Sequence, residues 1–160
     1  MNASHASRQR MFCTFRVNNQ LFGVDILDVK EVTAETTFTG VAHSPDEVLG
    51  LVNIRGHIYL ALGLRQLLGM PAALVTADSR LVLFKPSVGS AFGVVVDEIC
   101  DVQAVAADRI ESFAAVEHET VAVYVDRVDL IDAVCELTDE LLVILSPRRF
   151  LAVVEQSFAV

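Results

Sequence analysis

Gly50-Leu51-Val52-Asn53-Ile54-Arg55-Gly56 is the most informative segment for predicting the fold. It is followed directly by the apolar run His57-Ile58-Tyr59-Leu60-Ala61-Leu62. The branched and aromatic side chains in both runs suit the surface of a pleated sheet. Gly56 can take the positive φ that a hairpin corner requires. The leucines of Leu64-Arg65-Gln66-Leu67-Leu68 then have helical spacing. The pattern predicts a strand, a tight turn, a strand and a short helix.

Asn53 and Arg55 are the informative polar residues of this apolar stretch. A polar pair beside a hairpin corner either bonds to groups of its own fold, as buried polar groups usually do, or is presented to a partner. The residues alone leave both alternatives open.

The length and composition indicate a globular protein. Its 160 residues fit one domain or two small lobes that share a core. The chain is 53% hydrophobic, yet no apolar run approaches the roughly 18 residues that cross a bilayer. Residues 1–10 are polar and lack the apolar core of a secretory signal, so we expect them to form a disordered leader. The protein is therefore expected to be soluble and cytoplasmic.

The acidic residues are unevenly distributed along the chain. Residues 1–70 hold six basic and six acidic side chains, whereas residues 71–160 hold six basic and fifteen acidic ones. The whole net charge of −9 therefore lies in the second part. Such a surface repels phosphate backbones and anionic lipids, which argues against nucleic acid and membrane as partners and favours a protein partner with basic contacts.

No constellation typical of catalysis or metal binding stands out. The four histidines are scattered, and the three cysteines sit singly in apolar runs without paired ligand spacing. There is no nucleophile elbow and no phosphate-binding loop. The carboxylates of Asp97, Glu98 and Asp101 are candidates for a divalent cation, but acidic connections are more often only solvated. We therefore expect a binding module with no cofactor and no metal.

Short β segments dominate the rest of the chain. Apolar residues alternate from Met11 to Val17, which is typical of a half-buried strand. The segments that we expect as further strands are 21–24, 36–41, 80–85, 91–96, 120–125, 128–135 and 141–145. Apolar residues at helical intervals over 26–32 predict a helix or helical turn. Ser146-Pro147 places a cap residue before a first-turn proline, which predicts a helix to about residue 154.

Two short internal repeats suggest two lobes of similar architecture. Phe22-Gly23-Val24 recurs as Phe92-Gly93-Val94, and a strand end leading into a short helix occurs after both Leu62 and Leu145. Short strands with Gly and Pro turns indicate small barrels. The seam between two such lobes is a natural groove.

Apolar residues from both lobes are the candidates to line that groove. They are Ile26, Val29, Phe92, Val94 and Val96. A role in the core is the competing interpretation for each of them.

The central stretch with His57-Ile58 closely resembles the signature of the CheW-like chemotaxis coupling proteins. Other segments agree with the family pattern: Phe22 to Ile26, Val29 with Glu31-Val32, Pro45, Leu64-Arg65, Gly93 to Asp97, and Asp101-Val102. The likeness runs from about residue 11 to residue 151.

This resemblance implies a mostly β fold of two five-stranded SH3-like barrel lobes with short helices. We expect one CheW-like domain over residues 11–154, with a first lobe at about 11–71 plus C-terminal contributions, a second lobe at about 80–145, and a tail at 155–160. It also implies a non-catalytic adaptor that links the cytoplasmic tip of chemoreceptors to the regulatory domain of a CheA-type histidine kinase, in arrays at the inner membrane.

Site residues follow from the same resemblance, residue by residue. Ile26, Val29, Glu31, Asn53 and Arg55 would lie at or near the receptor and kinase surfaces. Gly50, Gly56 and Gly93 would shape turns.

Departures from the family pattern keep other readings open. The family often has Pro where this chain has Leu60, Asp at Gly63, Gly near Ala133 and Asp at Ser146. Loss of a carboxylate at position 63 could remove a local bond to Arg65. The alternatives are a regulatory adaptor that binds the kinase without receptors, and a β module that binds a small molecule or metal.

Overall fold

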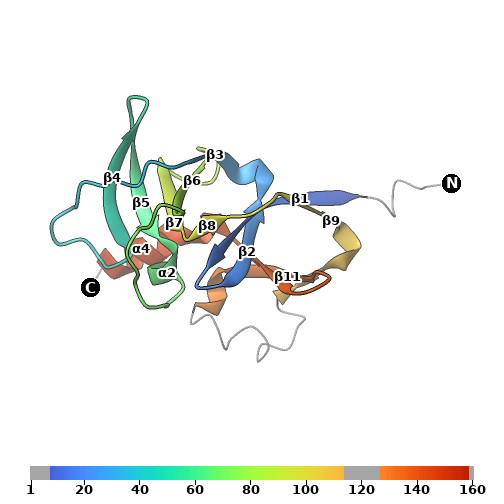
Figure 1. The fold of residues 1–160 in the computed structure, drawn as a ribbon. Helices are drawn as coiled ribbons and strands as arrows, with labels where there is room; N and C mark the ends of the chain where they lie inside the picture. The colour runs from blue at the N-terminus through green and yellow to red at the C-terminus, as the bar shows by residue number, and fades with distance from the viewer. Residues whose placement is uncertain (1–7, 114–126, 159–160) are drawn as a thin grey trace.

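The computed structural model describes residues 8–113 and 127–158, whose strands form two sheets that lie side by side (Figure 1). This confirms the predicted class, which is mostly β with two lobes. Within the two described ranges, no helix has the length and apolar composition needed to cross a membrane.

One lobe, called here the terminal lobe, is built from both ends of the chain. Its sheet contains β1 (Gln9–Val17), β2 (Gln20–Asp25), β8 (Glu98–Ile99), β9 (Gln103–Ala106), β10 (Ile110–Ser112), β11 (Ile131–Glu136) and β12 (Leu141–Leu145). The strand order is β10-β11-β12-β2-β1-β8, and β9 pairs with the first part of β1. The predicted first hairpin is confirmed, because β1 and β2 pair antiparallel across Asn18 and Asn19.

The other lobe, called here the central lobe, is continuous in sequence. It contains β3 (Val29–Thr33), β4 (Val48–Ile54), β5 (His57–Gly63), β6 (Arg80–Phe84) and β7 (Phe92–Val96), in the order β3-β6-β7-β5-β4. The predicted hairpins β4–β5 and β6–β7 are both present. The helix α2 (Leu64–Leu67) follows β5 directly, as the sequence predicts.

The lobes do not divide where the sequence pattern placed the boundary. Strands β6 and β7 belong to the same sheet as β3 to β5, and the hairpin β1–β2 pairs with β12. The division into 11–71 and 80–145 is therefore corrected. The spacing of strands along a chain says little about pairing between strands far apart in sequence, and here the central lobe is inserted between β2 and β8.

The repeated Phe-Gly-Val segments occupy equivalent strands in the two lobes. Strand β2 pairs in parallel with β12, and β7 pairs in parallel with β5. In both lobes, the parallel partner is the strand that leads into a helix: β5 into α2, and β12 into the 3₁₀ turn η5 (Pro147–Arg149) and α4 (Phe150–Phe158). Each lobe thus repeats one plan, although the order of its strands along the chain differs.

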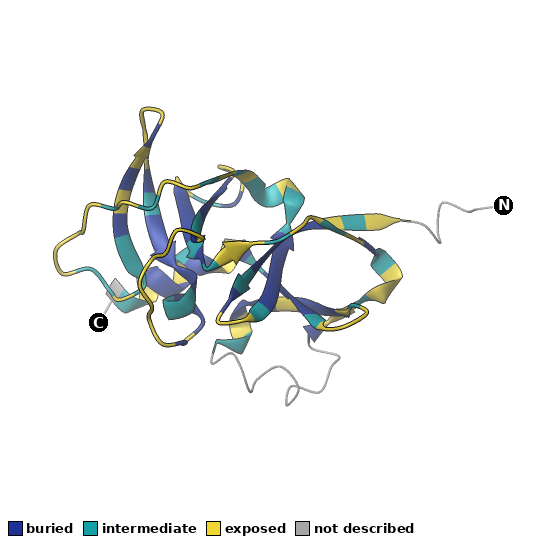
Figure 2. Cartoon of the chain, viewed as in Figure 1, coloured by how far each residue is buried: buried dark blue, intermediate teal, exposed yellow. Residues whose placement is uncertain are grey.

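A single large apolar core joins the two lobes. It includes Phe15 and Phe22 of the terminal lobe together with Phe84 and Phe92 of the central lobe, all of them fully or almost fully buried. Phe150 at the start of α4 packs edge-on to Phe84, with 6.0 Å between ring centroids. Figure 2 shows the buried residues concentrated in the strands, whereas the hairpin tip and many of the loops are exposed. A shared core of this kind fixes the relative position of the lobes.

Several local predictions differ from the structure. Of the helix or helical turn predicted over 26–32, the structure forms only the single 3₁₀ turn η1 (Ile26–Asp28). Strand β3 follows it, and its register shifts at Lys30. The segment 36–41 contributes only the isolated bridge between Thr39 and Leu51. Two further 3₁₀ turns in the described part of the chain are η2 (Ala107–Arg109) and η4 (Val128–Leu130).

The chain ends also differ from the prediction. Strand β1 begins at Gln9, inside the segment expected as a leader, because Gln9 and Arg10 pair with β9. Helix α4 runs to Phe158 and so includes most of the expected tail. Residues 1–7, the strand expected at 120–125, and residues 159–160 lie outside the described residues.

Candidate partner-binding surfaces

The turn of the β4–β5 hairpin is built by Arg55 and Gly56. Both have positive φ, 50° and 87°, as a two-residue type I′ turn requires. The side-chain oxygen of Asn53 accepts a hydrogen bond from the Gly56 amide at 2.8 Å. Asn53 is thus satisfied within its own turn, and its role here is to hold the corner in shape.

Arg55 extends from this turn toward β3, where it forms an ion pair with Glu31. The Arg55 side chain is 71% exposed, whereas the Glu31 side chain is 23% exposed. The hydrogen bond to Glu31 raises the pKa of Arg55 above its usual value. Next to this pair, Lys30 donates to the Tyr59 hydroxyl at 2.8 Å. Both contacts run between β3 and the β4–β5 hairpin.

Apolar side chains lie beside the ion pair on the outer face of the hairpin. Ile58, which is directly opposite Asn53, is 54% exposed, and Leu51 is also exposed. Figure 2 shows the hairpin tip as an exposed projection. We call this surface, made of Glu31, Leu51, Asn53, Arg55 and Ile58, the tip surface. It combines an exposed charge pair with apolar area, which is the composition of many protein interfaces.

Two of the three glycines expected to shape turns have another role. Gly50 lies inside β4 at φ 145°, and a side chain there would collide with the Thr39 carbonyl, which hydrogen bonds to this strand. Gly93 lies inside β7, where a Cβ atom would come within 2.5 Å of the Val82 carbonyl oxygen. Only Gly56 is a turn residue. The other two allow close approach of neighbouring backbone.

The predicted groove residues of β7 are in the core. Phe92, Val94 and Val96 are at most 1% exposed and belong to the cluster shared by both lobes. The structure corrects this part of the prediction, because their side chains present no surface to a partner. Ile26 and Val29 are half-buried and pack against the same cluster. The structure therefore brings together Glu31, Asn53 and Arg55, but not the full predicted set.

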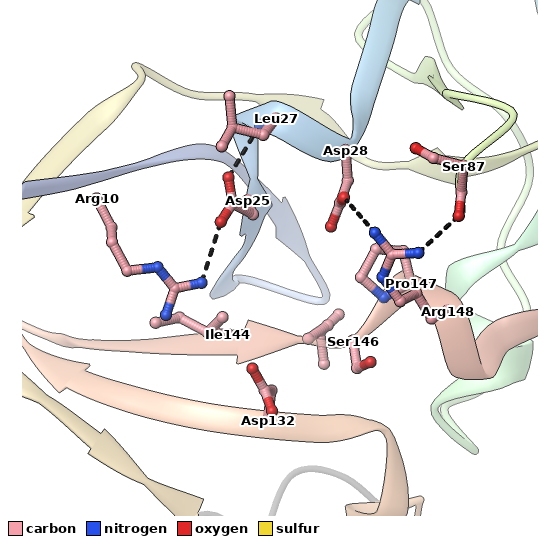
Figure 3. A pocket seen from close by; sticks show the side chains of 11 residues that line it. Arg10, Asp25, Leu27, Asp28, Ser87, Asp132, Ile144, Ser146, Pro147 and Arg148 are labelled. Atoms are coloured by element: carbon pink, nitrogen blue, oxygen red, sulfur yellow. Dashed lines mark hydrogen bonds and ion pairs between the residues drawn. The ribbon is translucent and has the colours of Figure 1, made fainter. Parts of the chain in front are cut away.

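A pocket of about 560 Å³ does lie between the lobes, at the turn η1 (Figure 3). Two ion pairs line it: Arg10 with Asp25 at 3.1 Å, and Arg148 with Asp28 at 3.2 Å. Arg148 also donates to the Ser87 carbonyl at 2.6 Å, which connects η5 to the loop between β6 and β7. We call this the interlobe pocket.

Leu27 is the apolar residue at the rim of the interlobe pocket. It is 71% exposed. The Asp25 carboxylate accepts a hydrogen bond from the Leu27 amide and so caps the turn η1 on which Leu27 lies. Sequence reasoning missed both Leu27 and Arg148. The only signal for Leu27 was its position between Asp25 and Asp28, and Arg148 gave none, since its partners are distant in sequence.

On the opposite side of the molecule, Arg65 of α2 forms two hydrogen bonds with Asp97, at 3.0 and 2.7 Å. Asp97 also accepts from the Asn18 amide of the terminal lobe at 2.8 Å, so it connects the lobes. Burial raises the pKa of Asp97, but the bonds from Arg65 and Asn18 outweigh it, and the pKa is lowered overall. Asp97 is thus engaged in the fold and is not a free metal ligand.

The glycine at position 63 leaves Arg65 with this distant partner. A Cβ atom at Gly63 would meet the Gln66 carboxamide, which occupies the space above the start of α2. The expected loss of a bond to Arg65 does not leave the guanidinium unpaired, because Asp97 supplies the carboxylate.

The acidic, histidine and cysteine side chains of residues 8–113 and 127–158 do not converge on an ion site. Among the residues that the structure describes, no group of three or more such side chains could hold a metal. Burial raises the pKa of the thiols of Cys13, Cys100 and Cys135, which keeps them protonated and unreactive at neutral pH.

Comparison with known proteins identifies the family. A model described as "CheW-like domain" matches residues 11–155. The chain belongs to the CheW-like family. The fold agrees: a scaffolding protein, TtCheW from Thermoanaerobacter tengcongensis, superposes with a TM-score of 0.74 and 23% identity over 86% of this chain and 89% of that one.

Named relatives are chemotaxis proteins. A probable chemotaxis protein CheW from Rhizobium etli is 31% identical over 102 residues, which are 64% of this chain and 65% of the relative. The chemotaxis protein CheW of Klebsiella aerogenes is 32% identical over 100 residues, which are 62% of this chain and 59% of the relative. The chain thus spans somewhat less than two thirds of the length of these CheW-like relatives.

Proposed function

We propose that this protein is a non-catalytic adaptor of a chemosensory pathway, which couples chemoreceptors to a CheA-type histidine kinase. The single observation that carries this proposal is the match of nearly the whole chain to the CheW-like family. Its relatives are named as chemotaxis proteins, and a structural neighbour is named as a scaffolding protein. In this proposal the adaptor works in the cytoplasm, on receptor arrays at the inner membrane.

The two surfaces suit two different partners. The tip surface is the end of a β lobe, with the exposed Arg55–Glu31 pair beside Leu51 and Ile58. An exposed hairpin tip of this kind can pack against another β domain, and we assign it to the regulatory domain of the kinase. Arginine is one of the residue types enriched at the hot spots of protein interfaces.

The interlobe pocket is assigned to the receptor tip. It is concave, with the exposed Leu27 at its rim and charged pairs on its walls. A helical hairpin can lay an apolar face against Leu27 while polar groups along its side meet the charged pairs. Because the pocket and the tip surface are distinct, one adaptor molecule can hold both partners at once.

Separate binding measurements test this assignment. Purified protein is titrated with the cytoplasmic fragment of a cognate chemoreceptor and, in a second series, with the cognate kinase. Leu27→Ala should weaken receptor binding about fivefold and leave kinase binding unchanged. Leu74→Ala is the matched control, because Leu74 is 92% exposed and lies in the loop before β6, outside the interlobe pocket and the tip surface.

Three outcomes decide the proposal. Binding of both partners, with the loss confined to Leu27→Ala, supports a coupling adaptor. Binding of the kinase alone would identify a regulator that does not engage receptors. Binding of neither would overturn the proposed function.

A further inference from the structure

Asp132 is placed in the interlobe pocket by an irregularity in strand β11. Ile131 pairs with Leu145, but Ala133 pairs with Ile144, so Asp132 is an extra residue on this strand. Such β-bulges redirect a side chain, and they occur often beside functional sites. Asp132 is exposed although Ile131 and Ala133 on either side are buried.

The bulge also explains how β11 serves two cores. Ile131 and Val134 both belong to the core shared by the lobes, whereas Ala133 belongs to a separate cluster of the terminal lobe. Two residues three positions apart cannot face the same side of a regular strand. The extra residue resolves this conflict and leaves the Asp132 side chain facing the pocket, as Figure 3 shows.

The charges of the pocket leave Asp132 without a counterpart. Arg10 is paired with Asp25, and Arg148 with Asp28. Within the described part of the chain, the carboxylate of Asp132 receives no hydrogen bond and forms no ion pair. Three aspartates and two arginines line the pocket, so it carries one uncompensated negative charge.

The surroundings of Asp132 suit the apolar stem of a basic side chain. Leu27 lies across the pocket from Asp132 (Figure 3) and is 71% exposed, so it offers apolar surface, whereas Ile144 and Leu145 are almost fully buried beneath the pocket. Lysine and arginine carry such a stem below a charged head. An acidic side chain would meet Asp132, and it would have to displace Asp25 or Asp28 to reach an arginine.

We infer that the interlobe pocket binds a lysine or arginine side chain on the receptor tip, with Asp132 as the acceptor. This inference rests on the proposed function and adds to it the charge of the residue that the receptor must present. Asp132 makes receptor binding selective for tips with a basic residue next to an apolar one. It contributes nothing to kinase binding, which uses the tip surface.

The test measures the affinity of three variants for the cytoplasmic fragment of a cognate chemoreceptor. Asp132→Asn removes the charge but keeps the shape, and we expect roughly fivefold weaker binding, as for a solvent-accessible ion pair. Asp132→Arg should weaken binding about tenfold or more, because it adds a like charge beside the bound cation. Asp139→Asn is the matched control, since Asp139 is exposed in the β11–β12 loop and outside this pocket.

Salt dependence and charge exchange give two further readouts. Receptor affinity of the unchanged protein should fall as salt rises, and that dependence should be weaker for Asp132→Asn. A receptor fragment whose basic tip residue is replaced by Glu should bind the unchanged protein poorly and regain affinity for Asp132→Arg. Thermal melting checks that each variant folds.

The result that overturns this inference alone is receptor binding by Asp132→Asn and Asp132→Arg equal to that of the unchanged protein. An equal loss of kinase binding would overturn it as well, because the effect would then not be specific to the receptor. If the unchanged protein itself fails to bind the receptor fragment, the receptor arm of the proposed function fails, and this inference fails with it.

Discussion

Two arginine–carboxylate pairs place the same chemistry in two different settings. Arg55 is 71% exposed and meets Glu31 at the tip of a hairpin. Arg65 is 20% exposed and makes two hydrogen bonds to Asp97, which in turn accepts from the Asn18 amide of the other lobe. The two pairs contain the same residue chemistry, so burial and the number of hydrogen bonds determine whether such a pair supports the fold or remains available to a partner.

The core beneath both pairs should show the largest effect on stability. Phe92→Ala removes a fully buried ring that packs 5.1 Å from the Phe84 ring, between centroids. We expect a loss of about 3–5 kcal/mol in the free energy of unfolding, measured by urea denaturation. A loss below about 1 kcal/mol, together with weaker partner binding, would show that Phe92 contacts a partner and is not a core residue.

The interlobe pair should come next. Asp97→Asn removes the negative charge of the carboxylate that accepts hydrogen bonds from the Arg65 side chain and the Asn18 amide. Because Asp97 is 35% exposed, we reduce the usual range for charged hydrogen bonds and expect a loss of about 1–2 kcal/mol. Asp78→Asn, an exposed aspartate nearby, is the control, and equal losses in the two variants would argue against a specific role for Asp97.

Acid should weaken the same contact. The pKa of Asp97 is lowered in the folded protein from its usual value of about 3.8, so the unfolded chain binds its proton first as the pH falls. The stabilisation is present above about pH 4 and is lost as the pH falls through the lower folded pKa. The pKa of Glu140 is likewise lowered by its bond to Arg16.

Urea denaturation between pH 7 and pH 3 measures this loss. The decline for Asp97→Asn should be shallower than for the unchanged protein, because the titrating carboxyl is gone. Parallel curves for the two proteins would show that other carboxylates cause the decline.

The tip pair should affect stability least and binding most. Arg55→Ala should leave the melting temperature unchanged, since the guanidinium group lies in solvent and its only partner is Glu31 among the residues described. Kinase affinity should fall about tenfold, because charged groups at an interface set both orientation and affinity. A large drop in melting temperature would show instead that Arg55 holds the hairpin to β3.

Much of the fold could be predicted because local pattern determines it. The alternation in β1, the runs of β6 and β7, and the turn at Gly56 identified strands and hairpins correctly. The apolar spacing over 26–32 was misleading, because Val29 packs on the core while Val32 is exposed, and the bulge at Lys30 breaks the alternation of a regular strand.

The site could be predicted less well than the fold. The signature stretch pointed to Asn53 and Arg55, but only the structure shows that Asn53 serves its own turn. The interlobe pocket depends on Arg10, Asp28 and Arg148, which are brought together by pairing between distant strands. No periodicity in the sequence encodes that proximity, and for the same reason the apolar β7 residues could not be separated from surface candidates.

The coupling role is tested by the autophosphorylation rate of the cognate kinase in the presence of receptor cytoplasmic fragments. We expect the protein to change this rate only when receptor and kinase are both present, and we expect either Leu27→Ala or Arg55→Ala to reduce the effect. A rate that changes equally without receptor, or does not change in the presence of both partners, would contradict the coupling role.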